Sequence, residues 1–178
     1  AYEKVIHQDL PPLFESIYKE ARKISDPIDQ INAVTSMLHV NLDHIVLTDW
    51  TAWCSINIDA IPRSLEKTVQ TDRSDSKDFA TATAAILSRL GYDARVALTY
   101  RDREYIPPLN TLPSLDLFNH AVVRVMTREE QLLWVDPYPP ISMAQGIFPH
   151  ISDRPALVLD GQEPLYIHIP RSTLIAPK

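Results

Sequence analysis

The stretch Ser74-Asp75-Ser76-Lys77-Asp78-Phe79-Ala80 opens the best-defined helical pattern in this chain. Apolar residues recur after it at helical spacing, and the pattern stops at Gly91, a residue type that commonly follows a helix end. Alanines between the apolar positions favour a helix and permit close packing. We therefore predict a helix from about Ser76 to Leu90 with one buried face, formed by Phe79, Thr83, Ile86, Leu87 and Leu90.

Beyond this helix the apolar pattern changes to alternation, which is typical of strands. Five strands are predicted: Ala94–Tyr100, His120–Met126, Leu132–Asp136, Pro155–Asp160 and Pro164–Ile169. A Pro-rich segment from Arg101 to Phe118 separates the first two strands. A connection of this length is expected to be an ordered loop near a functional site.

Helical signals dominate the first part of the chain. Pro11 and Pro12 precede a pattern of apolar residues at helical spacing, and proline is favoured at helix starts. Asp26 before Pro27 is a typical cap and first-turn pair for a second helix. A short helix is predicted from about Ser64 to Gln70. Helices followed mainly by strands indicate an α+β fold, with N-terminal helices packed on an antiparallel sheet.

Composition limits the classes of function. The chain has 178 residues, 45% of them hydrophobic and 22% charged, which is typical of one globular domain. The net charge of -6 argues against a nucleic-acid surface, because phosphate binding needs clustered Lys and Arg. No apolar run is long enough to insert into a membrane. Three glycines leave no Gly-rich phosphate loop, and the single cysteine, Cys54, excludes an internal disulfide.

Two predicted strands bring a histidine and an aspartate together. If His120–Met126 and Leu132–Asp136 form a hairpin centred near residue 128 or 129, residues of equal parity share a face. His120 and Asp136 then lie at the open end of the same hairpin, where the carboxylate can orient the imidazole as in a base-and-orienter pair. The third member of such a site is expected at a helix N-terminus, whose dipole and free N–H groups stabilise negative charge. Ser76 stands at that position.

These motifs resemble the transglutaminase-like superfamily, which has a papain-like core and a Cys-His-Asp order of catalytic residues. Ser74-Asp75-Ser76-Lys77-Asp78 stands where the family typically has Gly-Asp-Cys-Lys-Asp. Phe118-Asn119-His120-Ala121-Val122-Val123 resembles its histidine strand, and Trp134-Val135-Asp136-Pro137 its aspartate strand. The resemblance covers roughly residues 61–160 of a single domain, 1–178, whose first 50 residues are helical. It implies a domain excised from a larger protein, similar to bacterial and often periplasmic domains.

The chain departs from the family pattern at two positions, because Ser76 replaces the nucleophilic cysteine and Ser74 replaces the nearby glycine. A serine hydroxyl is far less acidic than a thiol, and a helix dipole worth ~1 kcal/mol cannot make it an alkoxide. Three explanations remain open: a naturally inactive or repurposed site, a Cys-to-Ser change introduced into an active enzyme, and an active serine enzyme. The second departure, at Ser74, favours natural loss.

Other residues have simpler interpretations. Cys54 is expected to be a buried packing residue, and Trp53 is a candidate for lining the cleft, although core packing also explains it. His39, Asp43 and His44 are residue types that can bind a metal, but their spacing is not diagnostic of a metal site. No cofactor and no metal are expected.

The resemblance and the lost thiol together predict a catalytically degenerate domain that binds a peptide or protein segment, or packs against neighbouring domains of its own chain. The alternative is a cysteine-type acyl transferase or peptidase, with His120 as base and acid and Asp136 as orienter. A third class is a purely structural domain whose cleft is filled by its own loop, and burial of Ser76 would favour it. The resemblance implies a periplasmic or otherwise extracytoplasmic location.

Overall fold

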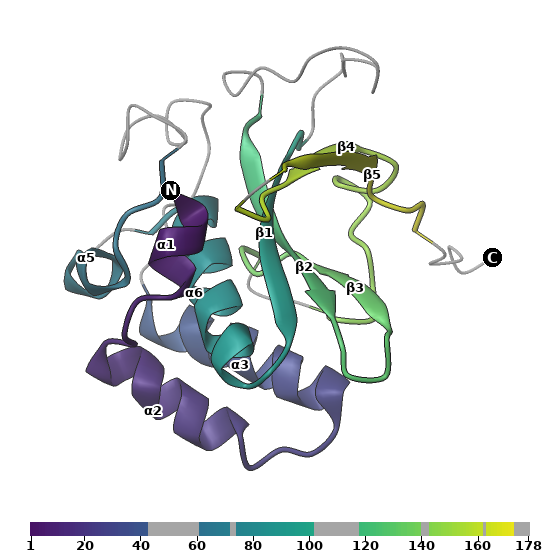
Figure 1. The fold of residues 1–178 in the computed structure, drawn as a ribbon. Helices are drawn as coiled ribbons and strands as arrows, with labels where there is room; N and C mark the ends of the chain where they lie inside the picture. Colours follow the sequence, from purple (N-terminus) through teal and green to yellow (C-terminus); the bar gives the residue numbers. More distant parts are fainter. Residues whose placement is uncertain (43–60, 72–73, 102–117, 140–142, 162, 173–178) are drawn as a thin grey trace.

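The computed structural model describes residues 1–42, 61–71, 74–101, 118–139, 143–161 and 163–172 (Figure 1). Within these ranges the helices are α1 (Tyr2–Ile6), α2 (Pro12–Ala21), α3 (Pro27–Asn41), α5 (Leu65–Gln70) and α6 (Ser76–Arg89). The strands are β1 (Asp93–Thr99), β2 (His120–Met126), β3 (Leu132–Val135), β4 (Pro155–Val158) and β5 (Leu165–His168). The chain therefore has the predicted α+β fold, with helices first and an antiparallel sheet after them.

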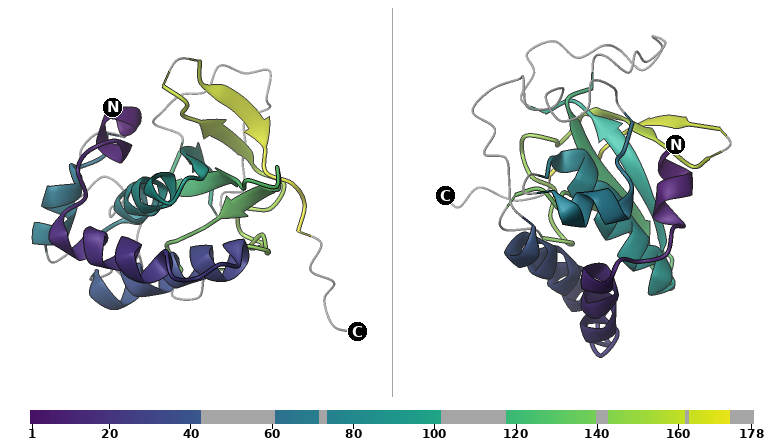
Figure 2. Two further views of the ribbon diagram at one scale, coloured as in Figure 1. Left: turned by 60° about the horizontal axis from the view of Figure 1, so that its bottom comes forward. Right: turned by 90° about the vertical axis from the view of Figure 1, so that its left-hand side faces the viewer.

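The strands form one antiparallel sheet in the order β3-β2-β1-β4-β5. Each strand predicted from alternating residues exists, with ends that differ by no more than two residues. The sheet is curled, because β4 and β5 turn away from the plane of β1, β2 and β3 (Figure 2). The central strand is β1, flanked by β2 and β4, so β2 is an internal strand and its first residue can contribute to a protected site.

Helix α6 is the central element of the helical layer. It contacts β1 and β2 on one side, and α1, α2, α3 and α5 pack around its other sides. Every residue from Ser76 to Leu87 is consequently buried, which corrects the prediction of a single buried face. The prediction was wrong because α6 is rich in Ala and Thr, small residues that allow several helices to approach closely while giving only a weak apolar stripe.

Alternating residues of the sheet divide the core into two clusters. One face, including Val96, Val123 and Val135, packs against the helices. The opposite face carries Val122 and Trp134 in a second cluster. That second cluster is closed by residues of the segment 147–151 and by the end of β5.

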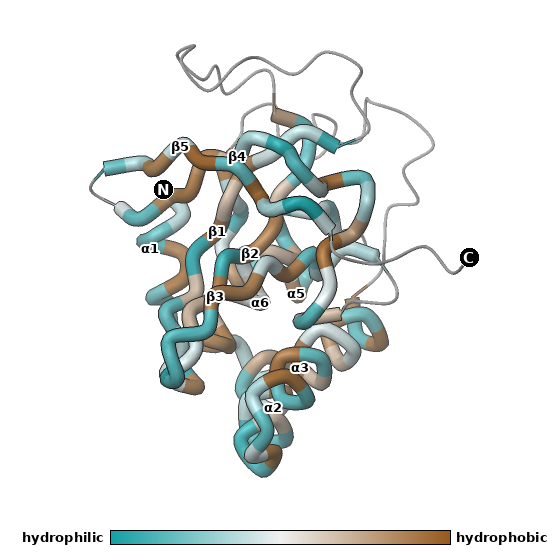
Figure 3. Tube along the Cα trace, turned by 90° about the vertical axis from the view of Figure 1, so that its right-hand side faces the viewer, coloured by the Kyte–Doolittle hydropathy of each residue, from teal (hydrophilic) through white to brown (hydrophobic). Residues whose placement is uncertain are grey.

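Hydrophobic and hydrophilic residues alternate along helices α2 and α3 (Figure 3). Their buried residues recur at helical spacing, so each helix has one apolar face. The predicted cap of α3 is confirmed, because the Asp26 carboxylate accepts a hydrogen bond from the backbone N–H of Asp29 at 2.9 Å. The buried residues of α2 are Phe14, Ile17 and Ala21, whereas Leu13 is only partly buried. Helix α1 was not predicted from the sequence.

No helix in the described ranges combines the length and apolar character needed to cross a membrane.

Candidate active site

The hairpin of β2 and β3 has the predicted register. Val123 pairs with Val135 and Arg124 with Trp134, so residues of equal parity lie opposite one another. His120 and Asp136 meet at the open end of this hairpin, where the His120 Nε2 atom lies 2.9 Å from Asp136 Oδ2. Both side chains are almost completely buried. The geometric prediction for this pair is confirmed, whereas their catalytic roles remain predictions.

The tautomer of His120 follows from its partner. An ionised carboxylate only accepts hydrogen bonds, so the proton lies on Nε2 and is donated to Asp136. In a neutral ring the other nitrogen, Nδ1, then carries a free lone pair. This Nδ1 atom is buried and has no hydrogen-bond partner within the described part of the chain. The ring is therefore oriented as a general base requires, with its acceptor nitrogen available.

Ser76 is the first residue of α6 and lies next to this pair. Its Oγ atom accepts a hydrogen bond from the backbone N–H of Ala121 at 3.3 Å, which places the hydroxyl beside the residue that follows His120. Ser76 is only 1% exposed. The three predicted residues are thus brought into one neighbourhood, where the N–H of Ala121 and the N-terminus of α6 both favour negative charge near the Ser76 position.

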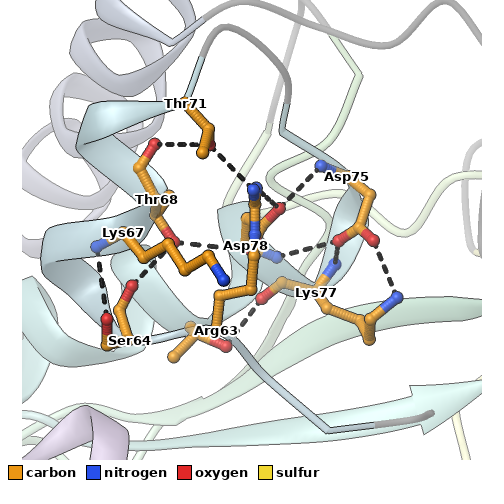
Figure 4. A network of polar contacts seen from close by, with 9 residues as sticks. Arg63, Ser64, Lys67, Thr68, Thr71, Asp75, Lys77 and Asp78 are labelled. Carbon is orange, nitrogen blue, oxygen red and sulfur yellow. Dashed lines mark hydrogen bonds and ion pairs between the residues drawn. The ribbon is translucent and has the colours of Figure 1, made fainter. Parts of the chain in front are cut away.

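The N-terminus of α6 is fixed by a buried polar network (Figure 4). The Asp75 carboxylate accepts from the backbone N–H groups of Lys77 and Asp78 at 2.8 and 3.1 Å, and the Asp78 carboxylate accepts from the N–H of Asp75 at 3.0 Å. This is a reciprocal capping box. The Lys77 ammonium donates to Asp75 at 2.7 Å, and Arg63 forms a two-bond ion pair with Asp78.

The charges of this network act on one another. Burial raises the pKa of the Asp75 carboxyl, as does the neighbouring Asp78 carboxylate, while the Lys77 ammonium opposes both effects. Burial also raises the pKa of the Tyr138 phenol, to about 12; the Arg101 guanidinium opposes this increase, and the Asp75 and Asp136 carboxylates add to it. Tyr138 therefore stays protonated at neutral pH. Its ring lies edge-on to that of His120, with centroids 6.0 Å apart.

A second histidine was missed by the sequence analysis. His150 Nε2 lies 2.9 Å from Asp136 Oδ2, the same oxygen that binds His120. Burial alone would raise the pKa of the Asp136 carboxyl, but the charges and hydrogen bonds of the two imidazoles outweigh burial and hold it well below its usual range. No local motif marks His150. The only sequence signal is its place directly after Gly146-Ile147-Phe148-Pro149, a segment that resembles the family's closing segment.

The depressed pKa of Asp136 predicts acid sensitivity. Because this carboxyl has a lower pKa in the folded chain than in the unfolded chain, unfolding takes up a proton once the pH falls below about 4. The stabilisation, on the order of 2 kcal/mol, is present above that pH and is lost as the pH falls through the folded-state pKa. Asp136→Asn should therefore lower the free energy of unfolding near neutral pH. In urea unfolding measured over a pH series, the variant's free energy of unfolding should also fall less steeply at acidic pH than that of the native chain.

Asp153→Asn is the matched control, because Asp153 also faces a histidine but both groups are about half exposed, with His168 Nδ1 at 3.7 Å. Exposed pairs of this kind contribute little. The prediction would be contradicted if the free energy of unfolding fell equally steeply at acidic pH in the native and Asp136→Asn chains.

The other predicted residues are only partly placed. Trp53, Cys54, Asp43 and His44 lie outside the described residues, as does the loop from 102 to 117. His39 Nε2 lies 2.6 Å from the carbonyl oxygen of Pro137, the residue after Asp136, and its ring stacks on Phe79. The two ends of the loop are held together by Asn119. Its side-chain amide accepts from the N–H of Arg101 at 2.7 Å and donates to the Arg101 carbonyl at 2.8 Å.

Comparison with known proteins places the fold but not the family. No protein-family model and no curated protein matches the chain. A solved structure from Parabacteroides distasonis, described as a "putative protease", matches with a TM-score of 0.61 and 10% sequence identity. The match covers 95% of this chain and 30% of that chain, so this chain spans about a third of that structure's length. At this identity the likeness shows a shared fold and nothing about activity.

Proposed function

We propose that this chain is a transglutaminase-like domain whose catalytic site is degenerate and whose role is noncatalytic. The observation that carries the proposal is the state of the nucleophile position. The His120–Asp136 pair is intact and the helix N-terminus is preorganised, but the group beside them is a buried hydroxyl where the resembling family has a thiol.

The chemistry of serine explains why this arrangement is poorly suited to catalysis. A thiol with a pKa near 8.5 becomes a thiolate beside a helix N-terminus and an imidazole, whereas a hydroxyl must lose its proton during attack. Such a transfer requires a hydrogen bond from Ser76 Oγ to His120. Within the described residues His120 Nδ1 has no such partner, and the hydrogen bond made by Ser76 Oγ is with the Ala121 N–H.

The burial of Ser76 bears on which noncatalytic role is favoured. A module that binds an extended peptide over its old nucleophile would leave that position open to the cleft. At 1% exposure the Ser76 hydroxyl is not open, so we favour a structural role, in which the domain packs against its neighbours, over peptide capture across this position. The location we propose is extracytoplasmic, on the family resemblance.

A second candidate function is supported by the unpartnered Nδ1 atom of His120. A cysteine-type acyl transferase or peptidase requires a histidine base with one ring nitrogen held by a carboxylate and the other able to accept a proton. His120 fits this description, because Nε2 is held by Asp136 and Nδ1 has no hydrogen-bond partner among the described residues. It applies if the natural residue at position 76 is cysteine, which the codon in the gene decides.

The test is a comparison of the serine-containing chain with its Ser76→Ala variant on peptide libraries and activated acyl esters. We expect equal rates that do not exceed the rate without protein. An active serine site would instead lose on the order of 10⁴-fold in Ser76→Ala, since each triad member is needed. His120→Ala is the second control. Turnover that requires both Ser76 and His120 would overturn the noncatalytic proposal.

A further inference from the structure

The cluster of His120, Asp136 and His150 has a property that the proposed function does not use. Two imidazole nitrogens converge on one carboxylate oxygen, with each Nε2 atom 2.9 Å from Asp136 Oδ2. One ligand atom from each residue lies within 4.8 Å of the others. We propose that these three side chains form a binding site for a transition-metal ion of the zinc class.

The donor set determines the class of ion. Two imidazoles and one carboxylate are the ligands of open zinc sites, in which water takes the fourth position, and of related iron sites. Magnesium and calcium prefer oxygen ligands throughout, so they should bind weakly here. In a tetrahedral site with bonds of about 2.0–2.1 Å, ligand atoms lie roughly 3.3 Å apart. The two contacts to Asp136 Oδ2 would lengthen from 2.9 Å toward that spacing, and the two Nε2 atoms, which lie within 4.8 Å of each other, would move to a similar separation.

The surroundings hold two of the three ligands, Asp136 and His150, in place before any ion binds. The second oxygen of the Asp136 carboxylate accepts the backbone N–H of Tyr138 at 3.2 Å, which fixes the carboxylate plane. The ring of His150 stacks on Phe148 with centroids 5.4 Å apart. Supporting contacts of this kind orient metal ligands and strengthen binding.

The site is also accessible from one side. The side chains of His120 and Asp136 are almost fully buried, but that of His150 is 19% exposed. His150 comes from the segment that covers the second core cluster, whereas His120 and Asp136 belong to the hairpin. An ion can therefore enter past His150 and would tie this covering segment to the sheet.

Metal binding would change what His120 can do. An ion on Nε2 leaves the proton of the neutral ring on Nδ1, so Nδ1 can no longer accept a proton. Occupation of the site and a base function of His120 thus exclude one another. The inference does not depend on the proposed function, because it concerns binding and applies to an active or an inactive domain.

The experiment is Zn²⁺ titration of the tag-free full chain by calorimetry and equilibrium dialysis, with Mg²⁺ as a comparison ion. We expect saturable binding of about one equivalent of Zn²⁺ per chain and no comparable binding of Mg²⁺. In His150→Gln the affinity should fall by at least ~100-fold, because a direct ligand matters more than the supporting groups whose loss costs 10–100-fold. His168→Gln is the matched control and should bind like the native chain.

Nitrogen NMR of the unmodified protein provides a readout that needs no variant. Zn²⁺ should shift the Nε2 resonances of two histidines, and Co²⁺ should give the visible spectrum of a low-coordinate site. Absence of saturable Zn²⁺ binding would overturn the inference, as would binding that survives in His150→Gln. Neither result would affect the proposed function, which is tested by turnover.

Discussion

Replacing Ser76 with cysteine, in a chain whose Cys54 is changed to serine, is expected to create a thiol with a pKa well below the ~8.5 of a free cysteine. The new sulfur would stand at the first position of α6, beside the N–H of Ala121 and next to the intact His120–Asp136 pair. Each of these groups stabilises a thiolate. If the thiol pKa falls to about 6.5, the thiolate fraction at that pH rises roughly 50-fold over a free thiol.

The measurement has two parts because Ser76 is buried. Thiolate absorbance in the ultraviolet, followed as a function of pH, gives the pKa without requiring access for a reagent. Alkylation by a small iodoacetamide probe across the same pH range then reports reactivity. Both measurements should be made with a chelator present, because a metal ion bound to His120 would prevent its imidazole from acting as a base.

His120→Ala in the Ser76→Cys background is the matched control. Its thiol pKa should return toward that of a free or buried cysteine, and fast labelling near neutral pH should disappear. A depressed pKa that depends on His120 would mean that only the nucleophile is missing from an otherwise working site. A thiol pKa near 8.5 that is the same with and without His120 would contradict the prediction. It would show that the site no longer activates a thiol, although its geometry is retained.

Local sequence patterns were sufficient for the strands and most helices. Alternating residues identified β2 with its observed ends, and the Asp26-Pro27 pair located the start of α3. The rule that residues of equal parity share a face of the hairpin was also enough to predict that His120 and Asp136 meet, because side chains alternate along a strand with a fixed period of two. These predictions succeeded because each depends on residues that are near one another in the chain or in one hairpin.

The failures concern contacts between segments that are distant in sequence. His150 lies in irregular structure, and only the folded chain brings it to Asp136. The buried pairing of Arg63 with Asp78 likewise joins two residues that no local sequence pattern connects. Full burial of α6 depends on how four helices surround it, which small residues permit but do not specify.

The Arg63–Asp78 pair leads to the largest expected effect on stability. Arg63 donates from Nε to Asp78 Oδ1 at 3.0 Å and bonds to Oδ2 with a second nitrogen, and neither side chain is more than 5% exposed. Arg63→Met would leave the Asp78 carboxylate buried without its cation, because its remaining described partners are the N–H of Asp75 and the hydroxyl of Thr68. Breaking a buried pair in this way costs about 3–5 kcal/mol of unfolding free energy.

Urea unfolding at neutral pH measures this loss, and Lys23→Met is the matched control. Lys23 pairs with Glu20 at 2.7 Å, but both side chains are more than 60% exposed. Removing an exposed pair should change stability by no more than about 1 kcal/mol. A loss in Arg63→Met as small as that in Lys23→Met would contradict the assignment of a buried ion pair.

The double variant Arg63→Met, Asp78→Leu separates the charge from the pair itself. With both charges removed no uncompensated carboxylate remains, so part of the loss should be recovered, although the capping bond from Asp78 to the Asp75 N–H is then missing. If the double variant is less stable than Arg63→Met by the ~1 kcal/mol that a lost cap costs, removing the charge has recovered nothing. The cost of Arg63→Met then comes from packing around the long arginine side chain, and the pair does not hold the start of α6 through its charge.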